Sequence, residues 1–453
     1  MKRLATSLLL IALTAFTSSH ANWPRLRGAE GNGIAAKDAD VPLTWSDTEN
    51  LSWKAAMPGP GSSSPIVWGE KVFVTCWSGY GDASGGTDMT KLVRHLVCLN
   101  LGDGRILWDK TVPAAQPEDV YQGMLTEHGY ASNTPVTDGE HVFVFFGKSG
   151  ALAFDMDGNQ LWQTDLGKSS SSKRWGSGAS PIVYKDFVIV NASDESRAIY
   201  ALDKKSGSQI WKAEGDTLES TYSTPVLVNR NGGAQDLVLG VTQELWGLNP
   251  DTGKLRWYAL HNLPGTMSPG VIVGSDALYV FGGFPVQGSA AFKSGGKGDV
   301  TESNKLWSKN DSSYIPTPIL HEGRLHVIND GGFAMCMDAK TGESIYRERV
   351  MESSGGGGPG GPGGGGPGRG GPGGGRRGGG GKPFYASPVL VGNKLYCVSR
   401  KNGTFVLDAG PQFKKLAVNV FASDKSQFNG TPAVVGKRLI MRSDSAVYCV
   451  SAK

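Results

Sequence analysis

The chain has 453 residues, of which 39% are apolar and 19% are charged, and its formal net charge at pH 7 is +4. So small a charge argues against nucleic acid and against an anionic membrane surface as partners, because both are bound through dense positive patches. The length alone would suggest about three domains.

The first 21 residues have the features of a secretory signal. Lys2 and Arg3 precede an apolar stretch over residues 4–16, and Ser19-His20-Ala21 matches a cleavage site. The stretch is too short to span a membrane, no other long apolar run exists, and no cysteine near Ala21 offers a bacterial lipid anchor. We expect cleavage after Ala21 and a periplasmic or secreted mature chain without a membrane span.

One pattern recurs along the mature chain. It consists of Ser/Thr-Pro, an apolar strand, a turn, a second strand, a small residue before Asp or Asn, and a turn with Gly-x-x-x-Trp. Most copies lie 44 to 49 residues apart, and two gaps of 70 residues contain insertions. A period in the forties with four strand-like segments predicts the blades of a β-propeller. The prolines that mark the copies are Pro65, Pro135, Pro181, Pro225, Pro269, Pro318, Pro388 and Pro432.

The second copy shows the unit most clearly. Residues 134–136 begin an inner strand, residues 141–146 and 151–155 are two middle strands, and residues 161–164 are the outer strand. The turns between them contain Gly and Asn, which tolerate positive φ, and the β-branched and aromatic runs suit half-buried strands.

An aromatic residue occupies the same outer-strand position in most copies. Such a ring can pack against the neighbouring blade, and its repetition from unit to unit favours a structural role over a catalytic one. We therefore predict a set of structural docking aromatics, which comprises Trp53, Trp108, Trp162, Trp211, Trp257, Trp307 and Tyr346.

The last copy starts at Thr431 and ends at Lys453 before any Trp, whereas Leu51-Ser52-Trp53-Lys54 is a Trp strand without a blade. The economical interpretation is that the N-terminal strand completes the C-terminal blade and closes the ring. The sequence thus predicts an all-β, eight-bladed propeller of four-stranded antiparallel blades, with residues 22–453 as a single domain.

Five cysteines in an exported chain first suggest disulfides. However, Cys98, Cys336 and Cys449 occupy the small-residue position that holds Ala or Gly in other copies, which predicts small buried apolar side chains. Cys76 and Cys98 fall on adjacent strands of the first blade, which would permit one bridge. The odd count leaves at least one thiol unpaired.

Residues 353–382 differ in composition from the rest of the chain. Residues 355–381 comprise 20 Gly, four Pro and three Arg. Such a segment buries no apolar surface, so we expect a disordered, solvated loop insertion within the propeller rather than an RNA-binding tract.

The long connections all belong to one face. In a four-stranded blade, the loop between the two middle strands lies on the same face as the connection from the outer strand to the next inner strand. The outer-to-inner connections 113–131 and 167–178, and the middle loops 78–91 and 282–289, are long, whereas the opposite face has mostly tight turns. Elaborated loops on a rigid scaffold usually carry binding, so this long-loop face is the predicted working face.

The best local candidates for ligand or partner binding precede inner strands and should crowd the rim of the channel: Glu127, His128, Tyr130, Arg174, Trp175 and Tyr222. His128 with Glu127 could form a metal or acid–base pair, but we favour a rim histidine bonded to nearby backbone. Trp175 and Tyr222 could stack on a ligand or simply cover the channel mouth.

No catalytic residue or metal site is predicted. Residues 155–159 faintly match a calcium loop but lack its remaining spacing and its terminal Glu. The chain has no haem-attachment Cys-x-x-Cys-His, no His-Glu-x-x-His, no Gly-x-Ser-x-Gly and no phosphate-binding loop.

The segments 201–211 and 248–257 resemble the pyrroloquinoline-quinone-type (PQQ-like) repeat, and the resemblance covers essentially the whole mature chain. The opening Asn22-Trp23-Pro24-Arg25-Leu26-Arg27-Gly28 is similar to that of exported, PQQ-like propeller proteins of planctomycetes. The repeat is specific for the fold and much less so for function.

The family has two branches. Quinoprotein dehydrogenases hold PQQ in the central channel between a Trp and a disulfide of adjacent cysteines, beside calcium and an Asp base, and this chain has no adjacent cysteines. The other branch, which this chain resembles more, is the non-catalytic propeller subunit of outer-membrane β-barrel assembly. This chain lacks that protein's lipid-anchor cysteine, so the resemblance does not imply membrane tethering.

We therefore expect a monomeric, non-catalytic scaffold without a cofactor, which binds a protein or polymeric ligand of the cell envelope through the long-loop face. The alternative is an alcohol or sugar dehydrogenase that depends on PQQ and calcium. A hydrolase or lyase that uses His128 in the channel is a third hypothesis.

Overall fold

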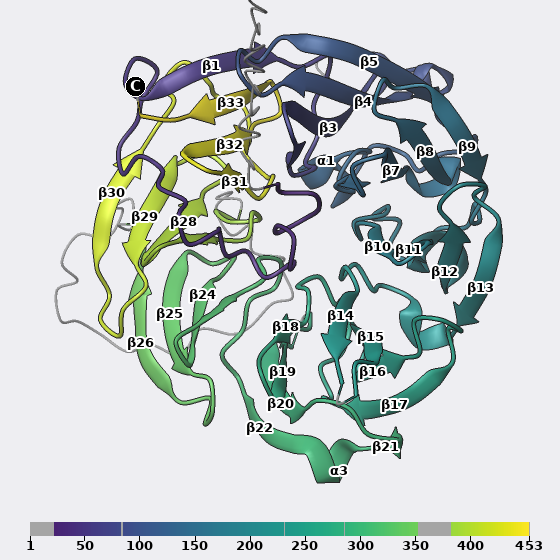
Figure 1. Ribbon diagram of the computed structural model, residues 1–453, viewed down its shortest axis with the longest axis vertical. Coiled ribbons are helices and arrows are strands. Elements are labelled where there is room, and N and C mark those ends of the chain that lie inside the picture. Colours follow the sequence, from purple (N-terminus) through teal and green to yellow (C-terminus); the bar gives the residue numbers. More distant parts are fainter. Residues whose placement is uncertain (1–21, 83–84, 231, 285, 352–381, 453) are drawn as a thin grey trace, which may run out of the picture.

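The computed structural model describes residues 22–82, 85–230, 232–284, 286–351 and 382–452. The expected signal sequence and residues 353–381 of the expected insertion lie outside these ranges. The described residues form eight sheets arranged around a common centre (Figure 1). The prediction of an all-β, eight-bladed propeller is therefore confirmed.

Each blade runs from an inner strand beside the central channel to an outer strand at the perimeter. The first four blades are β2 (Ile66–Trp68), β3 (Lys71–Ser78), β4 (Val93–Asn100), β5 (Ile106–Pro113); β6 (Val136–Thr137), β7 (His141–Phe145), β8 (Ala151–Asp155), β9 (Gln160–Thr164); β10 (Ile182–Tyr184), β11 (Phe187–Ala192), β12 (Ala198–Asp203), β13 (Gln209–Glu214); and β14 (Val226–Asn229), β15 (Gln235–Val241), β16 (Glu244–Leu248), β17 (Leu255–Leu260).

The other four blades are β18 (Ile272–Val273), β19 (Ala277–Gly282), β20 (Gly288–Lys293), β22 (Lys305–Lys309); β23 (Ile319–His321), β24 (Arg324–Ile328), β25 (Phe333–Asp338), β26 (Ser344–Arg349); β27 (Val389–Val391), β28 (Lys394–Val398), β29 (Thr404–Asp408), β30 (Lys415–Asn419); and β31 (Ala433–Val435), β32 (Arg438–Arg442), β33 (Ala446–Val450), β1 (Leu51–Ala56). The blades follow one another around the ring in the order of the chain, apart from β1 (Figure 1).

Short helical turns occupy the connections: η1 (Met89–Lys91), α1 (Leu125–His128), η2 (Gly147–Ser149), α2 (Ser193–Ser196), η3 (Asp216–Leu218) and α3 (Thr301–Asn304). The brief strand β21 (Gly298–Asp299) pairs in parallel with β17, so the fourth blade gains a fifth strand from the connection between β20 and β22 of the fifth blade. In the described part of the chain no helix combines the length and the apolar character that crossing a bilayer requires.

The ring closes through its N-terminal strand. β1 pairs antiparallel with β33, and Trp53 lies opposite Cys449. The prediction that the head of the chain completes the last blade is therefore confirmed. The closure matters because unpaired edges of β33 and β1 would otherwise be open to pairing with other chains.

The outer-strand aromatics lie opposite the small residues of the same blade. The paired positions are Trp108–Cys98, Trp162–Ala153, Trp211–Ala201, Trp257–Gly247, Trp307–Ala291, Tyr346–Cys336 and Trp53–Cys449. A small side chain there leaves room for the ring, which explains why Ala, Gly and Cys interchange at this position.

Most of these indoles also join neighbouring blades. The Nε1–H groups of Trp53, Trp108, Trp162, Trp211 and Trp307 donate to backbone carbonyls of the next blade at 2.8–3.3 Å. A turn glycine with positive φ lies against each ring, and a Cβ there would approach the indole to 2.5–2.8 Å, at Gly104, Gly158, Gly207, Gly253 and Gly342. Only glycine combines a positive φ at low cost with the absence of a Cβ that would clash with the indole.

Trp257 differs because the next blade carries α3 and β21 where the others have this turn. Its Nε1–H donates within its own blade, to the buried Asp236 Oδ2 at 2.7 Å. Asp236 also accepts from Arg256 Nη1 at 2.5 Å.

All five cysteines lie within the described residues and are buried free thiols. The disulfide that adjacent strands would permit is not formed, because the β3–β4 register places Cys76 opposite His95 and Cys98 opposite Phe73. Burial raises the pKa of the Cys76 thiol to about 11. These cysteines pack as small apolar groups, as the repeat predicts for three of them.

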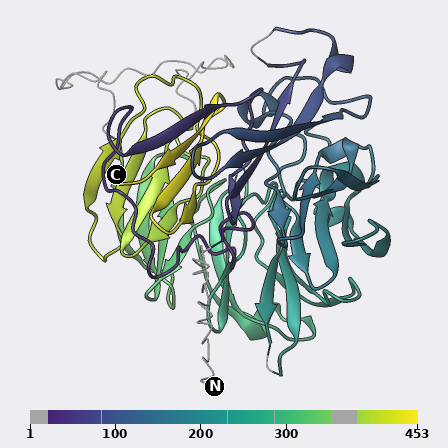
Figure 2. The same ribbon diagram turned by 45° about the horizontal axis from the view of Figure 1, so that its top comes forward.

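Residues 22–42, here called the N-terminal strap, cross the centre of the ring on the side opposite the long loops (Figures 1 and 2). Trp23 bridges to Val67 of the first blade, and Ile34 bridges to Leu390 of the seventh blade. The strap also accepts a hydrogen bond from Tyr396 Oη at the Val41 carbonyl, 3.3 Å. One end of the channel is therefore closed by the chain itself.

Candidate functional site

A ring of hydroxyl groups surrounds the channel where the inner strands begin. These Ser and Thr residues each precede a repeat proline, and each accepts a hydrogen bond from a backbone N–H of the preceding blade at 2.9–3.0 Å. Among the described residues the hydroxyl ring comprises Ser64, Thr134, Ser180, Thr224, Thr317, Ser387 and Thr431.

The ring is interrupted at the fifth blade. Ser268, at the equivalent position, makes no hydrogen bond with another described residue, and Gly270 N donates to Thr317 in place of a Ser268 N–H. The ring explains why the repeat requires Ser or Thr before its proline. The side chain ties neighbouring inner strands together while the proline N needs no partner.

These hydroxyls line a central cavity of about 200 Å³. Its mouth, on the long-loop face, is flanked by the aromatic side chains of Trp175, Tyr222, Tyr314 and Tyr385. Its floor is formed by Arg25, Leu26 and Arg27 of the N-terminal strap. The cavity is thus a pocket with one open end.

Arg27 places a buried positive charge at the floor. Within the described chain its guanidinium donates only to carbonyl oxygens: Thr317 at 2.7 Å, Asn32 at 2.7 Å, Pro318 at 2.8 Å and Gly31 at 3.3 Å. Burial lowers the pKa of Arg27 to about 9, so the group remains charged at neutral pH. Of the described residues that line the cavity, none is Asp or Glu.

Three of the predicted rim residues line this cavity: His128, Trp175 and Tyr222. The Trp175 and Tyr222 rings are stacked with centroids 6.1 Å apart, and Lys173 Nζ lies 5.0 Å from the Trp175 ring centroid. Stacking these rings on each other gives the mouth a flat apolar wall.

His128 is held by its surroundings. Its Nδ1 shares a hydrogen bond with Ser132 Oγ at 2.5 Å, and its carbonyl accepts from Ser62 Oγ at 2.8 Å. Burial lowers the pKa of His128 to about 4, so the imidazole is neutral at neutral pH. The geometry matches a histidine that positions the rim.

Glu127 does not pair with His128. Its carboxylate forms an ion pair with Arg400 Nη1 at 2.6 Å, and Arg400 lies over the Tyr385 ring at 4.1 Å from the centroid. Glu127 therefore ties α1 to the seventh blade. No group of three or more His, Cys, Asp or Glu in the described part of the chain could hold a metal ion.

Tyr130 and Arg174 lie away from the cavity. Tyr130 is buried in an aromatic cluster with Trp77, Tyr80 and Tyr121, and its hydroxyl donates to the Asp119 carbonyl at 2.6 Å. Arg174 is exposed on its loop with a φ of 52°. Their positions in the sequence indicate the right loops, but not where the side chains point.

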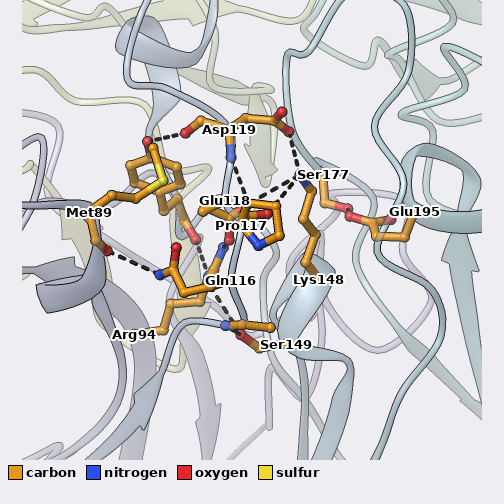
Figure 3. A network of polar contacts seen from close by, with 12 residues as sticks. Met89, Arg94, Gln116, Pro117, Glu118, Asp119, Lys148, Ser149, Ser177 and Glu195 are labelled. Carbon is orange, nitrogen blue, oxygen red and sulfur yellow. Dashed lines mark hydrogen bonds and ion pairs between the residues drawn. The ribbon is translucent and has the colours of Figure 1, made fainter.

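A buried network of charges holds the 113–131 connection, as Figure 3 shows. Glu118 pairs with Arg94 at 2.5 Å, and Asp119 pairs with Lys148 at 3.2 Å. Asp119 also accepts from Ser170 Oγ at 2.8 Å to each oxygen, which links this connection to the 164–182 connection. The two longest described rim connections are thus fixed to each other and to the blades beneath them.

Glu195 lies beside this network (Figure 3). It accepts from Ser177 Oγ at 2.5 Å through Oε1, and its buried Oε2 has no hydrogen-bond partner among the described residues. Burial, together with the neighbouring Asp194, raises the pKa of Glu195 to about 8. This carboxyl group is therefore largely protonated at neutral pH.

The residues that quinone chemistry would require do not fit this cavity. The resemblance to quinoprotein dehydrogenases implies adjacent disulfide-bonded cysteines, a calcium ion and an Asp base. All five described cysteines are free, and the described lining offers a Trp but no carboxylate and no cysteine. Without a carboxylate the lining has no hard anionic ligand for calcium.

Sequence reasoning missed the hydroxyl ring and the strap. The Ser/Thr before each repeat proline was visible as a pattern, and its recurrence in all eight copies could have pointed to contacts between blades. The strap carries no strand periodicity, so nothing in residues 22–42 indicated that Arg27 would enter the channel.

A family model described as outer membrane protein assembly factor BamB matches residues 93–348. BamB from Moraxella catarrhalis is 14% identical with a TM-score of 0.55, covering 88% of this chain and 96% of that one. Quinohemoprotein alcohol dehydrogenase from Comamonas testosteroni is 10% identical with a TM-score of 0.59, covering 96% and 81%.

A europium-containing methanol dehydrogenase is 11% identical with a TM-score of 0.56, covering 95% of this chain and 89% of that one. At such identities these structural similarities show the fold alone. No curated protein matches the chain significantly in sequence.

Proposed function

This chain belongs to the family of the outer membrane protein assembly factor BamB, and from that premise we propose that it is a non-catalytic propeller scaffold of the cell envelope that binds a protein partner through its long-loop face. A non-protein polymer with the same surface chemistry is the other ligand class that we expected from the sequence. We further propose that the chain acts as a monomer in the periplasm or outside the cell.

The observation that carries this proposal is the distribution of exposed apolar side chains. Outside the outer strands and residues 22–43, four apolar side chains in long-face connections are exposed: Val120 (48%), Phe284 (41%), Val286 (61%) and Val420 (46%). On the opposite face only Val273, at 37%, is comparable among the described residues. Exposed apolar side chains that gather on one face favour that face as the protein interface.

Packing and ion pairs hold these side chains from beneath. Phe284 packs against Tyr314 at 5.2 Å between ring centroids, and Lys382 lies over Tyr314 at 4.1 Å. Val120 projects from the connection that Glu118 and Asp119 fix from below. A pre-organised surface loses little conformational entropy on binding, which favours affinity.

The buried network changes how the site should be tested. Deleting residues 113–131 would leave Arg94 and Lys148 buried without their partners, and it would therefore damage the fold as well as the surface. The informative change is confined to side chains at the loop surface, such as Val120→Asp combined with Arg174→Glu.

We expect the double variant V120D/R174E to lose at least tenfold in capture of envelope proteins, because it places two negative charges on the binding surface. The matched control is V273D/K340E, which makes the same changes on the opposite face. Both variants should keep the thermal midpoint of the parent protein. The measurement is quantitative pull-down from an envelope extract. Equal capture by the two variants would show that the long-loop face is not the interface.

A further inference from the structure

The hydroxyl ring gives the central cavity several hydrogen-bond donors that can point to one ligand. Each hydroxyl of the ring already uses its oxygen to accept a backbone N–H. None of these hydroxyls donates to another described residue. Their O–H hydrogens are therefore available to whatever occupies the cavity.

The charge of the cavity favours a negatively charged ligand. Arg27 is fully charged at the floor, Arg25 lies beside it, and no Asp or Glu is among the described lining residues. Arg27 is satisfied by carbonyl dipoles but has no negative partner among the residues that the structure describes. A buried cation without a counter-ion is costly, and an anion that enters the cavity would relieve that cost.

The shape limits the size of the anion. The pocket closes at the strap, so a chain cannot pass through it, and about 200 Å³ holds on the order of seven water volumes. The walls near the mouth are aromatic, with Trp175, Tyr222, Tyr314 and Tyr385 around the opening. Aromatic side chains around the mouth favour a ligand that has a flat apolar group near the mouth and its anionic group deeper in the cavity.

We infer that the central cavity is a binding site for a carboxylate attached next to an aromatic ring, of about the size of one terminal aromatic residue. The carboxylate lies toward the hydroxyl ring and Arg27, and the aromatic ring lies between the aromatic walls. Two sources share this chemistry: a free small acid, or the C-terminal residue of the partner chain. The second source rests on the proposed function.

The test compares N-acetyl-L-phenylalanine with its carboxamide by isothermal titration of the full mature chain. We expect the acid to bind with a dissociation constant on the order of 1 mM. The amide should bind at least tenfold more weakly, because it is neutral and offers no negative charge to Arg27. Equal affinities, or no binding of the acid up to about 20 mM, would overturn the inference.

Substitutions of the lining residues identify the groups that bind the carboxylate. Arg27→Gln should reduce the affinity for the acid to that for the amide. Because Arg27 also anchors the strap, Ser268→Ala gives a second test that leaves all hydrogen bonds of the hydroxyl ring in place. This variant should lower the affinity for the acid about threefold and leave the affinity for the amide unchanged. The control Ser275→Ala, on the opposite face, should change neither the affinity for the acid nor that for the amide. Unchanged affinity for the acid in both R27Q and S268A would refute the site.

A competition experiment separates the two sources. Release of a captured envelope protein by 20 mM N-acetyl-L-phenylalanine, but not by the amide, would assign the site to a chain end. Retention of the protein, with the acid still bound, would assign it to a free small acid. Because V120D/R174E leaves the cavity lining intact, loss of capture in that variant with normal binding of the acid shows that the two proposals stand separately.

Discussion

At the scale of single residues, the protonation of Glu195 makes the stability of the folded protein depend on pH. It is 3% exposed, and its pKa of about 8 lies well above the usual value for a glutamate. The folded protein therefore retains a proton that the unfolded chain releases above a pH of about 4.3. The retained proton stabilises the folded state fully at pH values below about 4.3, and this stabilisation is lost as the pH rises through about 8.

We predict that the free energy of unfolding falls as the pH rises from 6.5 to 8, by up to about 1.4 kcal/mol per pH unit. Glu195→Gln, which mimics the protonated form, should flatten this slope and be the more stable protein at pH 8. His128 does not interfere, because its lowered pKa of about 4 costs stability only as the pH falls below about 6.5. Urea unfolding at several pH values measures the slope.

The exposed Glu140→Gln is the matched control and should keep the parent slope. A parent protein whose stability is independent of pH over this range would contradict the assignment of a protonated Glu195. So would an identical slope in the parent and in E195Q.

At the scale of elements, β1 stands out because it belongs to the last blade in space but to the start of the chain. Trp53 is buried, donates to the Leu101 carbonyl at 2.9 Å and lies against Gly104 of the first blade. We predict that Trp53→Ala lowers the free energy of unfolding by about 3–5 kcal/mol through loss of a large buried ring. Hydrogen–deuterium exchange should rise in both Leu51–Ala56 and Ala446–Val450.

Trp162→Ala provides the comparison, because Trp162 makes the same kind of contact between two blades that are continuous in sequence. Its cost should be similar, but the added exchange should stay near β9 and β13. If W53A left exchange in Ala446–Val450 unchanged, β1 would not be holding the last blade.

These elements were predictable because their signals are local and repeated. Turn glycines, alternating apolar residues and an outer-strand aromatic in most units recur at a fixed period, so the count of blades and the closure by residues 51–54 follow from the sequence. The rim was partly predictable for the same reason, since His128, Trp175 and Tyr222 precede inner strands. Tyr130 shows the limit, because its orientation depends on packing against Trp77 and Tyr121 from other segments.

At the scale of the whole molecule, the sequence could not predict the floor of the cavity. Arg27 reaches carbonyls nearly 300 residues away in the chain, and such contacts exist only once the ring is assembled. The donor-rich character of the cavity likewise depends on all blades together, since each hydroxyl is turned by the N–H of its neighbour. The fold therefore creates a chemistry that no single repeat contains.

The lack of a carboxylate in the described lining argues against an enzyme that depends on PQQ and calcium. If calcium and PQQ shared the cavity, saturating ligand at about 100 times its dissociation constant would add about 2.7 kcal/mol of stability. We predict that calcium adds nothing to any effect of PQQ on the melting temperature, because no carboxylate lines the described cavity to hold the ion. N-acetyl-L-phenylalanine, by contrast, should raise the melting temperature with or without calcium. A calcium-dependent shift of several degrees with PQQ, accompanied by dye-linked alcohol oxidation, would identify a dehydrogenase and refute the scaffold.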